Sequence, residues 1–439
     1  MAETGDATQP FPLRPTRGSS TPHLLLVFFQ LFFLSSPSFA GRRWIAIGTL
    51  SILAIWAQLS PWTHNPGAAN FAALAWPHWL ATIEKFLNDT PTPEAALWPV
   101  DKDAGVALSY FPFGFRKLKW AVALILNLRG IRYNFQVKNV QKPRFTSTQR
   151  RGVILFILWQ SMELAYFMLM GDLVAQLGMR LFFPSGPDQH GRIDMQLDIR
   201  DADWRMSFLK ALVFGSGPYF FINMQYTLVS IFFVAIGVSK PEDWPPLFGR
   251  LAEATTVRSF WGKFWHQMIR KVGLPSPRPP SSLALSQLTS KKPQQPLQGL
   301  TRRIVDVVGI KRGTNTSSYM QLWFSFAISG VMHAASMTLM PCPASVSEWD
   351  RWSGLVFYFL WQAAAITFED FVLFVWRSAF GGGGESRTWK SVVGYVWVTC
   401  SFWFSLPMAA DVMLKLRMGE VSPFPWTLWG PLVEMLFPQ

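Results

Sequence analysis

The chain has 439 residues, of which half are hydrophobic, 15% are aromatic and only 15% are charged, whereas about a quarter are charged in an ordinary globular protein. This composition argues against a set of soluble domains and excludes disorder, collagen and coiled coil, so it predicts an integral membrane protein. The 40 Lys and Arg residues against 26 Asp and Glu residues give a formal charge of +14. Two cysteines and six scattered histidines predict no metal site.

Apolar stretches recur along the chain, and a membrane span needs about 20 mostly apolar residues. The stretch 207–238 contains Gly215, Gly217 and Pro218, which predict a broken helix or a re-entrant pair. The stretch 118–128 is too short to span, and we expect it in the membrane interface. We predict an all-α, polytopic membrane protein with about seven or eight spans: 24–40, 44–60, 152–179, 207–238, 320–341, 353–376, 391–414 and the shorter, Pro-rich 424–437.

The other segments predict a simple domain organisation. Residues 1–23 are rich in Pro, Ser and Thr and are predicted to be a disordered leader, followed by a single membrane-embedded domain at 24–439. Residues 24–40 also fit a cleaved signal peptide, because Ser38-Phe39-Ala40 has small residues at the required spacing. The Pro-, Ser- and Gln-rich segment 275–300 is predicted to be flexible. Asn88-Asp89-Thr90 is a weak glycosylation sequon, since Pro91 follows it.

The charges of the loops alternate in sign. Residues 116–151 carry ten basic residues and no acidic ones, and residues 239–319 carry thirteen basic and four acidic residues. The loops 61–105 and 180–206 have more acidic than basic residues. Basic loops stay in the cytosol. We therefore place 116–151, 239–319 and 377–390 in the cytosol, and the intervening loops 61–105, 180–206 and 342–352 in the lumen.

The basic loop contains a segment, 258–270, with a helical aromatic pattern. Four residues at i, i+1, i+4 and i+5 would share one helix face: Phe260, Trp261, Phe264 and Trp265. The pattern predicts an amphipathic helix at the membrane surface. His266 adjoins the aromatic face and would lean over Gly262. Periodicity alone favours an interfacial helix whose histidine is only an amphipathic anchor.

A second histidine, His333, lies near the middle of the predicted span 320–341. An ionisable side chain at that depth is costly and is usually functional or paired. Ser329 could hydrogen-bond one ring nitrogen and leave the other as a base. A packed histidine bonded to a neighbouring helix is the alternative. Glu369 and Asp370 in the next span could pair with basic groups, orient a histidine or bond a neighbouring helix.

Three blocks carry a family resemblance: 241–249 (PEDWPPLFG), 259–267 (SFWGKFWHQ) and 329–333 (SGVMH). They resemble the wax-synthase branch of the membrane-bound O-acyltransferases, and most closely its fungal members that acetylate terpenoid or meroterpenoid alcohols. Arg129-Gly130-Ile131, flanked by Asn127 and Asn134, and the Glu369-Asp370 pair resemble further motifs of the family. The resemblance covers roughly residues 120–415.

The resemblance implies transfer of an acyl group from acyl-CoA to an alcohol. His333 falls on the family's catalytic histidine. His266 falls on a second polar position, often Asn in plant wax synthases, so three roles stay open for it: binding substrate, polarising the thioester carbonyl, or transferring a proton. A neutral His333 would take the alcohol proton as the alcohol attacks the thioester. Ser329 would orient that ring.

The remaining site residues follow from the charges of this reaction. The oxyanion needs hydrogen-bond donors, for which we expect His266, Trp261 or Trp265. The negative charges of CoA would be attracted by nearby basic groups, for which we expect the side chains of Arg258, Lys263 and Arg270.

These inferences predict an enzyme of the endoplasmic reticulum membrane that binds no cofactor, metal or nucleic acid. It would use acetyl-CoA and a hydrophobic alcohol from the bilayer. An enzyme for long acyl chains that makes wax or sterol esters is one alternative. A proton-coupled transporter that uses His333 and Glu369-Asp370 as a relay is another.

Overall fold

The computed structural model describes residues 12–87, 92–147, 150–183, 199–265, 301, 304–305, 307–311, 313–380 and 387–438. These residues are mainly helical, and their only β-type pairings are two isolated bridges, Leu13–Pro343 and Pro99–Tyr133. The predicted all-α class is therefore confirmed. The contacts divide the described residues into two interleaved units. Unit 1 draws on Met1–Pro15, Gln141–Phe264 and Met340–Gln439, and unit 2 on Thr16–Val140 and Trp265–Leu339.

Unit 1 contains four helices that are long and apolar enough to cross a membrane. They have 28 to 33 residues, so each is about 40 to 50 Å long against a hydrocarbon core of about 30 Å. The protein is therefore an integral membrane protein. Of the seven or eight spans expected, these are the ones that meet both criteria among the described helices: α7 (Arg150–Phe182), α8 (Trp204–Ala235), α12 (Ser353–Phe380) and α13 (Arg387–Lys415).

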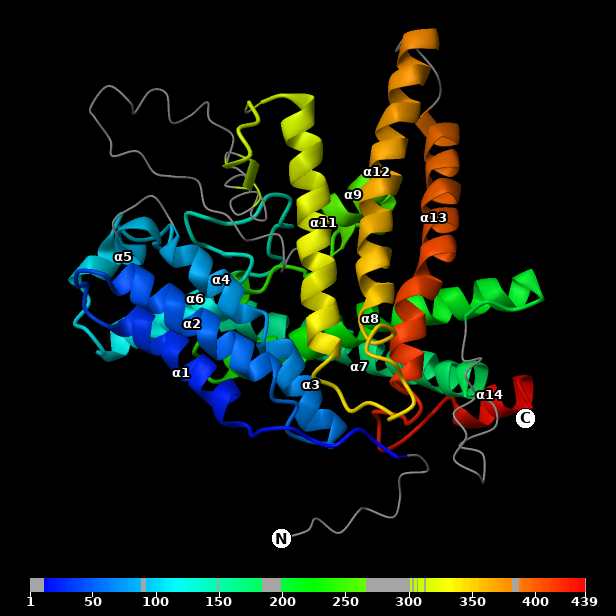
Figure 1. Ribbon diagram of the computed structural model, residues 1–439, viewed down its shortest axis with the longest axis horizontal. Coiled ribbons are helices and arrows are strands. Elements are labelled where there is room, and N and C mark those ends of the chain that lie inside the picture. Colours follow the sequence, from blue (N-terminus) through cyan, green and yellow to red (C-terminus); the bar gives the residue numbers. More distant parts are fainter. Residues whose placement is uncertain are drawn as a thin grey trace. The chain divides into compact units, whose positions relative to one another are not determined.

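The helix α8 corrects the prediction of a broken or re-entrant segment. It runs unbroken from Trp204 to Ala235, with Pro218 inside it. A Cβ at Gly215 would lie 3.0 Å from a methyl carbon of Leu406 on α13, so this glycine admits a neighbouring helix. The antiparallel partner α7 lies beside α8 (Figure 1). Packing of α8 against α7 and α13 compensates for the loss of the one backbone hydrogen bond that proline cannot form.

The helices of unit 1 meet closely at small residues. A Cβ at Gly354 on α12 would lie 2.1 Å from the carbonyl oxygen of Met408 on α13, and a Cβ at Gly394 on α13 would lie 2.2 Å from that of Thr255. Just before the start of α7, the Oγ of Ser147 donates a hydrogen bond of 2.7 Å to the carboxylate of Glu242. These contacts place the segment after α8 against both α7 and the α12–α13 hairpin.

The predicted final span, 424–437, is instead a loop and the seven-residue helix α14 (Gly430–Leu436), which is too short to cross a membrane. The fully buried carboxylate of Asp172 on α7 holds this segment. It accepts the backbone N–H groups of Leu428 at 2.8 Å and Trp429 at 3.2 Å. Asp172 therefore has a structural role.

Unit 2 holds the N-terminal helices and the helix that carries His333. The first has 15 residues, two fewer than the expected span 24–40, and the second has 17, as many as the expected span 44–60. Figure 1 shows α1, α2, α4 and α6 side by side. The sequence pattern did not indicate the short helices α3 and α4. The main helices are α1 (Thr21–Ser35), α2 (Arg42–Gln58), α3 (Pro66–Ala75), α4 (His78–Phe86), α6 (Phe115–Leu126) and α11 (Asn315–Met337).

A buried ionic cluster in unit 2 corrects the predicted sidedness. Glu94 accepts a bond from Lys117 Nζ at 2.7 Å and bonds from Arg42 at 2.7 and 2.9 Å. All three side chains are 5% exposed or less. Glu94 was assigned to the lumen and Lys117 to the cytosol, but direct contact requires both to lie on one side of the membrane. At least one of the two assignments is therefore wrong, because net loop charge does not reveal that one buried carboxylate pairs with two distant cations.

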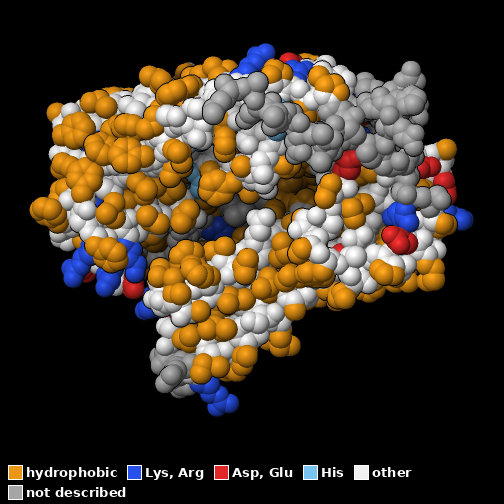
Figure 2. Space-filling model, turned by 90° about the horizontal axis from the view of Figure 1, so that it is seen from below, with side chains coloured by type: hydrophobic (Ala, Val, Ile, Leu, Met, Phe, Trp, Pro, Cys, Tyr) orange, Lys and Arg blue, Asp and Glu red, His pale blue; other side chains and the backbone are white. Residues whose placement is uncertain are grey.

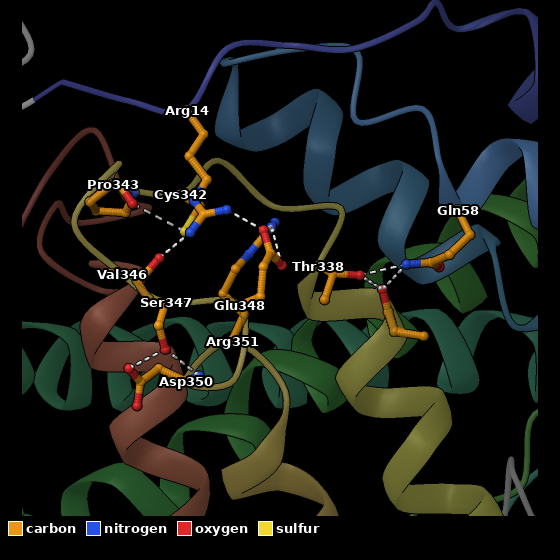
Figure 3. Close-up of polar contacts among 11 residues, drawn as sticks. Arg14, Gln58, Thr338, Cys342, Pro343, Val346, Ser347, Glu348, Asp350 and Arg351 are labelled. Atoms are coloured by element: carbon orange, nitrogen blue, oxygen red, sulfur yellow. Dashed lines mark hydrogen bonds and ion pairs between the residues drawn. The ribbon is translucent and has the colours of Figure 1, made fainter.

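Part of the leader that was predicted to be disordered forms contacts within unit 1. Arg14 N–H donates to the Cys342 carbonyl at 2.8 Å, and Ala344 N–H donates to the Pro12 carbonyl at 2.9 Å. The Arg14 side chain reaches Glu348, which also pairs with Arg351 at 3.1 Å (Figure 3). Backbone pairing and charge therefore hold residues 12–14 against the loop after α11.

Large apolar side chains are exposed along the long helices, as expected for surfaces that face lipid. On α12 these include Phe368, Phe371 and Phe374, which are 54 to 67% exposed. Figure 2 shows hydrophobic side chains over much of the visible face. Exposure of this apolar surface to water would be unfavourable, so we expect lipid to cover it.

Candidate active site

His333 lies on α11, whose first turn is capped by the Thr314 hydroxyl accepting the Ser317 N–H at 3.1 Å. The imidazole Nδ1 lies 2.7 Å from the carbonyl oxygen of Ser329, one turn earlier, and the ring is partly buried. A carbonyl oxygen can only accept, so Nδ1 carries the proton and the Nε2 of the neutral ring keeps its lone pair. The tautomer is therefore fixed by the backbone of Ser329 rather than by its hydroxyl.

The helix α11 is anchored close to this histidine. Gln58, at the end of α2, donates from Nε2 to the Ala335 carbonyl at 3.1 Å, and the Thr338 hydroxyl donates to the same carbonyl at 2.8 Å (Figure 3). Ser329 and Gly330, beneath the ring, are buried. The imidazole thus sits on a helix face of small side chains within unit 2.

The aromatic segment corrects the prediction of an amphipathic surface helix. It forms a short turn, α9 (Val257–Ser259), followed by a π-helical turn (Phe260–Phe264). The rings of Phe260, Trp261 and Phe264 pack against the long helices of unit 1. Phe260 lies 4.4 Å from Phe402 on α13, and Phe264 stacks on Tyr219 of α8 at 6.0 Å between ring centroids. Three long helices provide apolar partners that the sequence pattern does not reveal.

The indole of Trp261 has a fixed partner. Its Nε1–H donates to the side-chain oxygen of Gln362 on α12 at 3.2 Å, and Gln362 is fully buried. Because this N–H is already engaged, Trp261 is not available to stabilise an oxyanion in this structure. Trp265, at the end of the described segment, is partly buried. His266 and Arg270 lie outside the described residues, so their roles stay predictions.

The expected basic residues differ in their surroundings. Arg258 forms an ion pair with Asp370, with its Nε 3.3 Å from Oδ1, and its side chain is half exposed. Lys263 is exposed to solvent. Unit 1 therefore contains Arg258, Lys263 and Trp261, whereas Ser329 and His333 belong to unit 2. Proximity of His266 and His333 also stays a prediction.

Glu369 and Gln362 on α12 organise the aromatic segment. Glu369 Oε2 accepts the backbone N–H of Val257 at 2.7 Å and the indole N–H of Trp397 at 3.1 Å. The Glu369-Asp370 pair thus contacts α9 through a backbone amide and a guanidinium. Sequence reasoning missed Gln362, although a polar residue in an apolar span two turns before Glu369 was an available signal.

The motif around Arg129 shapes a loop in unit 2. Asn127 makes two bonds of 2.9 Å to the backbone of Ile131, one from its amide nitrogen and one to its oxygen. Asn134 Nδ2 donates to the Ala96 carbonyl at 2.8 Å. These side chains replace backbone partners where the chain turns, so both asparagines have structural roles.

No group of three or more His, Cys, Asp or Glu among the described residues is arranged to hold a metal ion. The residues that remain for chemistry are the His333 imidazole in unit 2 and, in unit 1, an aromatic segment flanked by basic groups. These features suit proton transfer beside an anionic substrate.

Residues 244–360 match the membrane bound O-acyl transferase family, and residues 152–235 match the aspirochlorine biosynthesis protein F C-terminal domain. Aspirochlorine biosynthesis protein F from Aspergillus oryzae is 53% identical over 232 residues, which are 52% of this chain and 89% of that protein. The chain therefore belongs to the membrane-bound O-acyltransferase family and is an acyltransferase.

Two relatives carry the name acetyltransferase. Acetyltransferase ple2 from Rhodocybe pseudopiperita is 30% identical over 292 residues, covering 66% of this chain and 65% of the relative. Acetyltransferase pyr8 from Aspergillus fumigatus is 30% identical over 330 residues, covering 69% of this chain and 67% of the relative. Both similarities support the fungal acetyltransferase branch that the motifs indicated.

Proposed function

We propose that this protein transfers an acetyl group from acetyl-CoA to a hydroxyl of a hydrophobic terpenoid or meroterpenoid intermediate in secondary metabolite biosynthesis. Family membership supports acyl transfer, and the names of the relatives support acetyl as the group transferred and biosynthesis as the context. The apolar surface supports an acceptor that enters from the bilayer. By family resemblance, the membrane is that of the endoplasmic reticulum.

The observation that carries the mechanism is the 2.7 Å bond from His333 Nδ1 to the Ser329 carbonyl. It leaves Nε2 as the base that removes the proton from the acceptor hydroxyl. The hydroxyl oxygen attacks the thioester carbonyl, and the tetrahedral intermediate collapses with loss of the CoA thiolate. The imidazolium then returns its proton to the thiolate.

Other groups stabilise the charges of this reaction. His266 and Trp265 are the candidate donors to the oxyanion, because the N–H of Trp261 is engaged by Gln362. Arg258, Lys263 and Arg270 are the candidates for binding the phosphates of CoA. Arg258 would exchange part of its exposed contact with Asp370 for a phosphate.

The test uses microsomes that contain the wild-type protein or His333→Ala at equal abundance. Each is incubated with labelled acetyl-CoA or a labelled long-chain acyl-CoA and a panel of terpenoid alcohols. We expect labelled acetate esters from the wild type only. Turnover by purified, folded His333→Ala would refute the general base, and transfer only from the long-chain donor would refute acetyl transfer.

A further inference from the structure

We propose that Glu369 and Gln362 are positioning residues that hold the segment 256–264, including Trp261, in the conformation required for acyl-CoA binding and transfer. This inference rests on the proposed function, because it takes that segment to be part of the acyl-CoA-binding site. Neither side chain would contact the substrate. Both act from α12 through a segment that precedes them by about 100 residues.

Glu369 holds the start of the segment. Its side chain is 7% exposed, and its Oε2 accepts the Val257 N–H and the Trp397 indole N–H. The first N–H groups of a helical turn have no partner within that turn, and a carboxylate binds them well. Thr256 caps the same turn locally, accepting the Ser259 N–H at 2.9 Å. The turn is therefore fixed both by its own cap and by a distant helix.

Gln362 holds the middle of the segment. Its oxygen accepts the Trp261 N–H, and its Nε2 donates to the Ser405 hydroxyl on α13 at 3.1 Å. Positions 362 and 369 are seven residues apart and so lie on one face of α12. Phe359 shares this face, with its ring centroid 5.9 Å from that of Trp261. One buried stripe of α12 thus determines both where the segment begins and how its tryptophan is oriented.

The arrangement suits positioning better than bulk stability. A buried carboxylate inside an apolar helix is costly unless it is fully hydrogen-bonded, and packing alone could be achieved with apolar side chains. The segment carries Lys263 and is followed in the sequence by Trp265 and His266. A displacement of about 1 Å at reacting groups can lower a rate by about 100-fold. The polar contacts of Glu369 and Gln362 therefore serve catalysis by keeping the segment in place.

The first test is Glu369→Gln, which keeps the side chain's size but replaces one acceptor oxygen with a donor. We expect a higher KM for acetyl-CoA and a lower kcat, which together lower kcat/KM by about 10- to 100-fold. The acid limb of the pH profile, which reports His333, should keep its midpoint. Asp411→Asn is the matched control. Its carboxylate is 44% exposed on α13 beside Lys415, and wild-type kinetics are expected.

The second test is Gln362→Met, which keeps the length of the side chain and removes its hydrogen bonds to Trp261, Ser405 and the Tyr358 carbonyl. We expect a raised KM for acetyl-CoA with little change in Tm. Wild-type kcat and KM per folded molecule in Glu369→Gln and Gln362→Met, even with a lowered Tm, would make these residues merely structural and overturn the proposal. Equal activity of wild type and His333→Ala would instead refute the proposed general base, so the two failures are distinguishable.

Discussion

The Nδ1 atom of His333 donates a hydrogen bond of 2.7 Å to the carbonyl oxygen of Ser329 in the same helix. This bond uses a backbone acceptor that no side-chain substitution at residue 329 removes. It also means that the orientation of the imidazole is set within one helical turn. Removal of the alcohol proton is therefore expected to depend on the side chain at residue 333 and not on the side chain at residue 329.

His333→Asn separates hydrogen bonding from basicity. The asparagine amide N–H replaces the Nδ1–H donor, but an amide has no basic nitrogen, so we expect activity to fall by about 100- to 10,000-fold. Initial rates of the purified variant with labelled acetyl-CoA measure the effect, and its elution on size exclusion checks the fold. Activity within threefold of wild type, about 0.7 kcal/mol of barrier, would contradict a base at residue 333.

His266→Asn tests the second histidine. If His266 donates to the thioester oxygen or binds substrate, the amide N–H of asparagine should replace it in part, and kcat should fall by about tenfold or less. The measurement is kcat at saturating acetyl-CoA. Complete loss of activity in a folded protein would point instead to proton transfer by His266.

Arg258→Ala tests the binding of CoA phosphates. Losing one charge-assisted hydrogen bond should raise the KM for acetyl-CoA by about tenfold, and high salt should reduce the difference from wild type. Arg132→Ala is the control, because Arg132 forms an exposed pair with Asp101 at 3.1 Å in unit 2. Equal changes of KM in both variants would argue against a specific role for Arg258.

Glu94→Gln should destabilise the protein. Burial alone would raise the pKa of Glu94, but hydrogen bonds from Arg42 and Lys117 outweigh it and hold the pKa below its ordinary value. The stabilisation is therefore present above the unfolded pKa and is lost as the pH falls through the folded pKa. Breaking a buried pair costs about 3 to 5 kcal/mol, so we expect a lower Tm in detergent at pH 7. The difference from wild type should shrink at acid pH, and an unchanged Tm at pH 7 would contradict the role.

Lys85→Met should have the opposite effect on stability. Lys85 is 6% exposed, and burial lowers its pKa from 10.5 to about 8. At pH 7 the folded protein therefore keeps a charge that burial disfavours, and replacing it should raise Tm. Wild-type stability should increase between about pH 8 and 10.5, where only the unfolded state binds the proton. A lower Tm for Lys85→Met at pH 7 would show that the bond from Nζ to the Ala81 carbonyl outweighs desolvation.

The sequence predicted the membrane class, the long helices and the family, because hydropathy and motif spacing are local properties of the chain. It also singled out His333 as unusual, since a histidine in a predicted span is visible without a fold, although α11 is not among the four helices that meet the span criteria. Its errors involve contacts between distant residues. The charges of their loops assign Glu94 and Lys117 to opposite sides, and only their direct contact contradicts this.

The aromatic segment and α8 show the same limit. The helical spacing of Phe260 and Trp261 was visible in the sequence, but their partners lie on helices about 100 or more residues later, so burial between helices looked like a surface pattern. Gly215 and Pro218 are residues that often interrupt a helix, yet packing against other helices keeps α8 continuous.

The linear order of residues thus determined that this protein lies in a membrane and belongs to an acyltransferase family. Both conclusions depend on side-chain types and their spacing, which folding does not change. Only the tertiary structure decided that Glu369 and Gln362 hold the aromatic segment, that Trp261 has a buried partner, and which ring nitrogen of His333 carries the proton. These outcomes depend on distances of about 3 Å between groups, often far apart in the chain, and hydrogen-bond geometry exists only once the helices have packed.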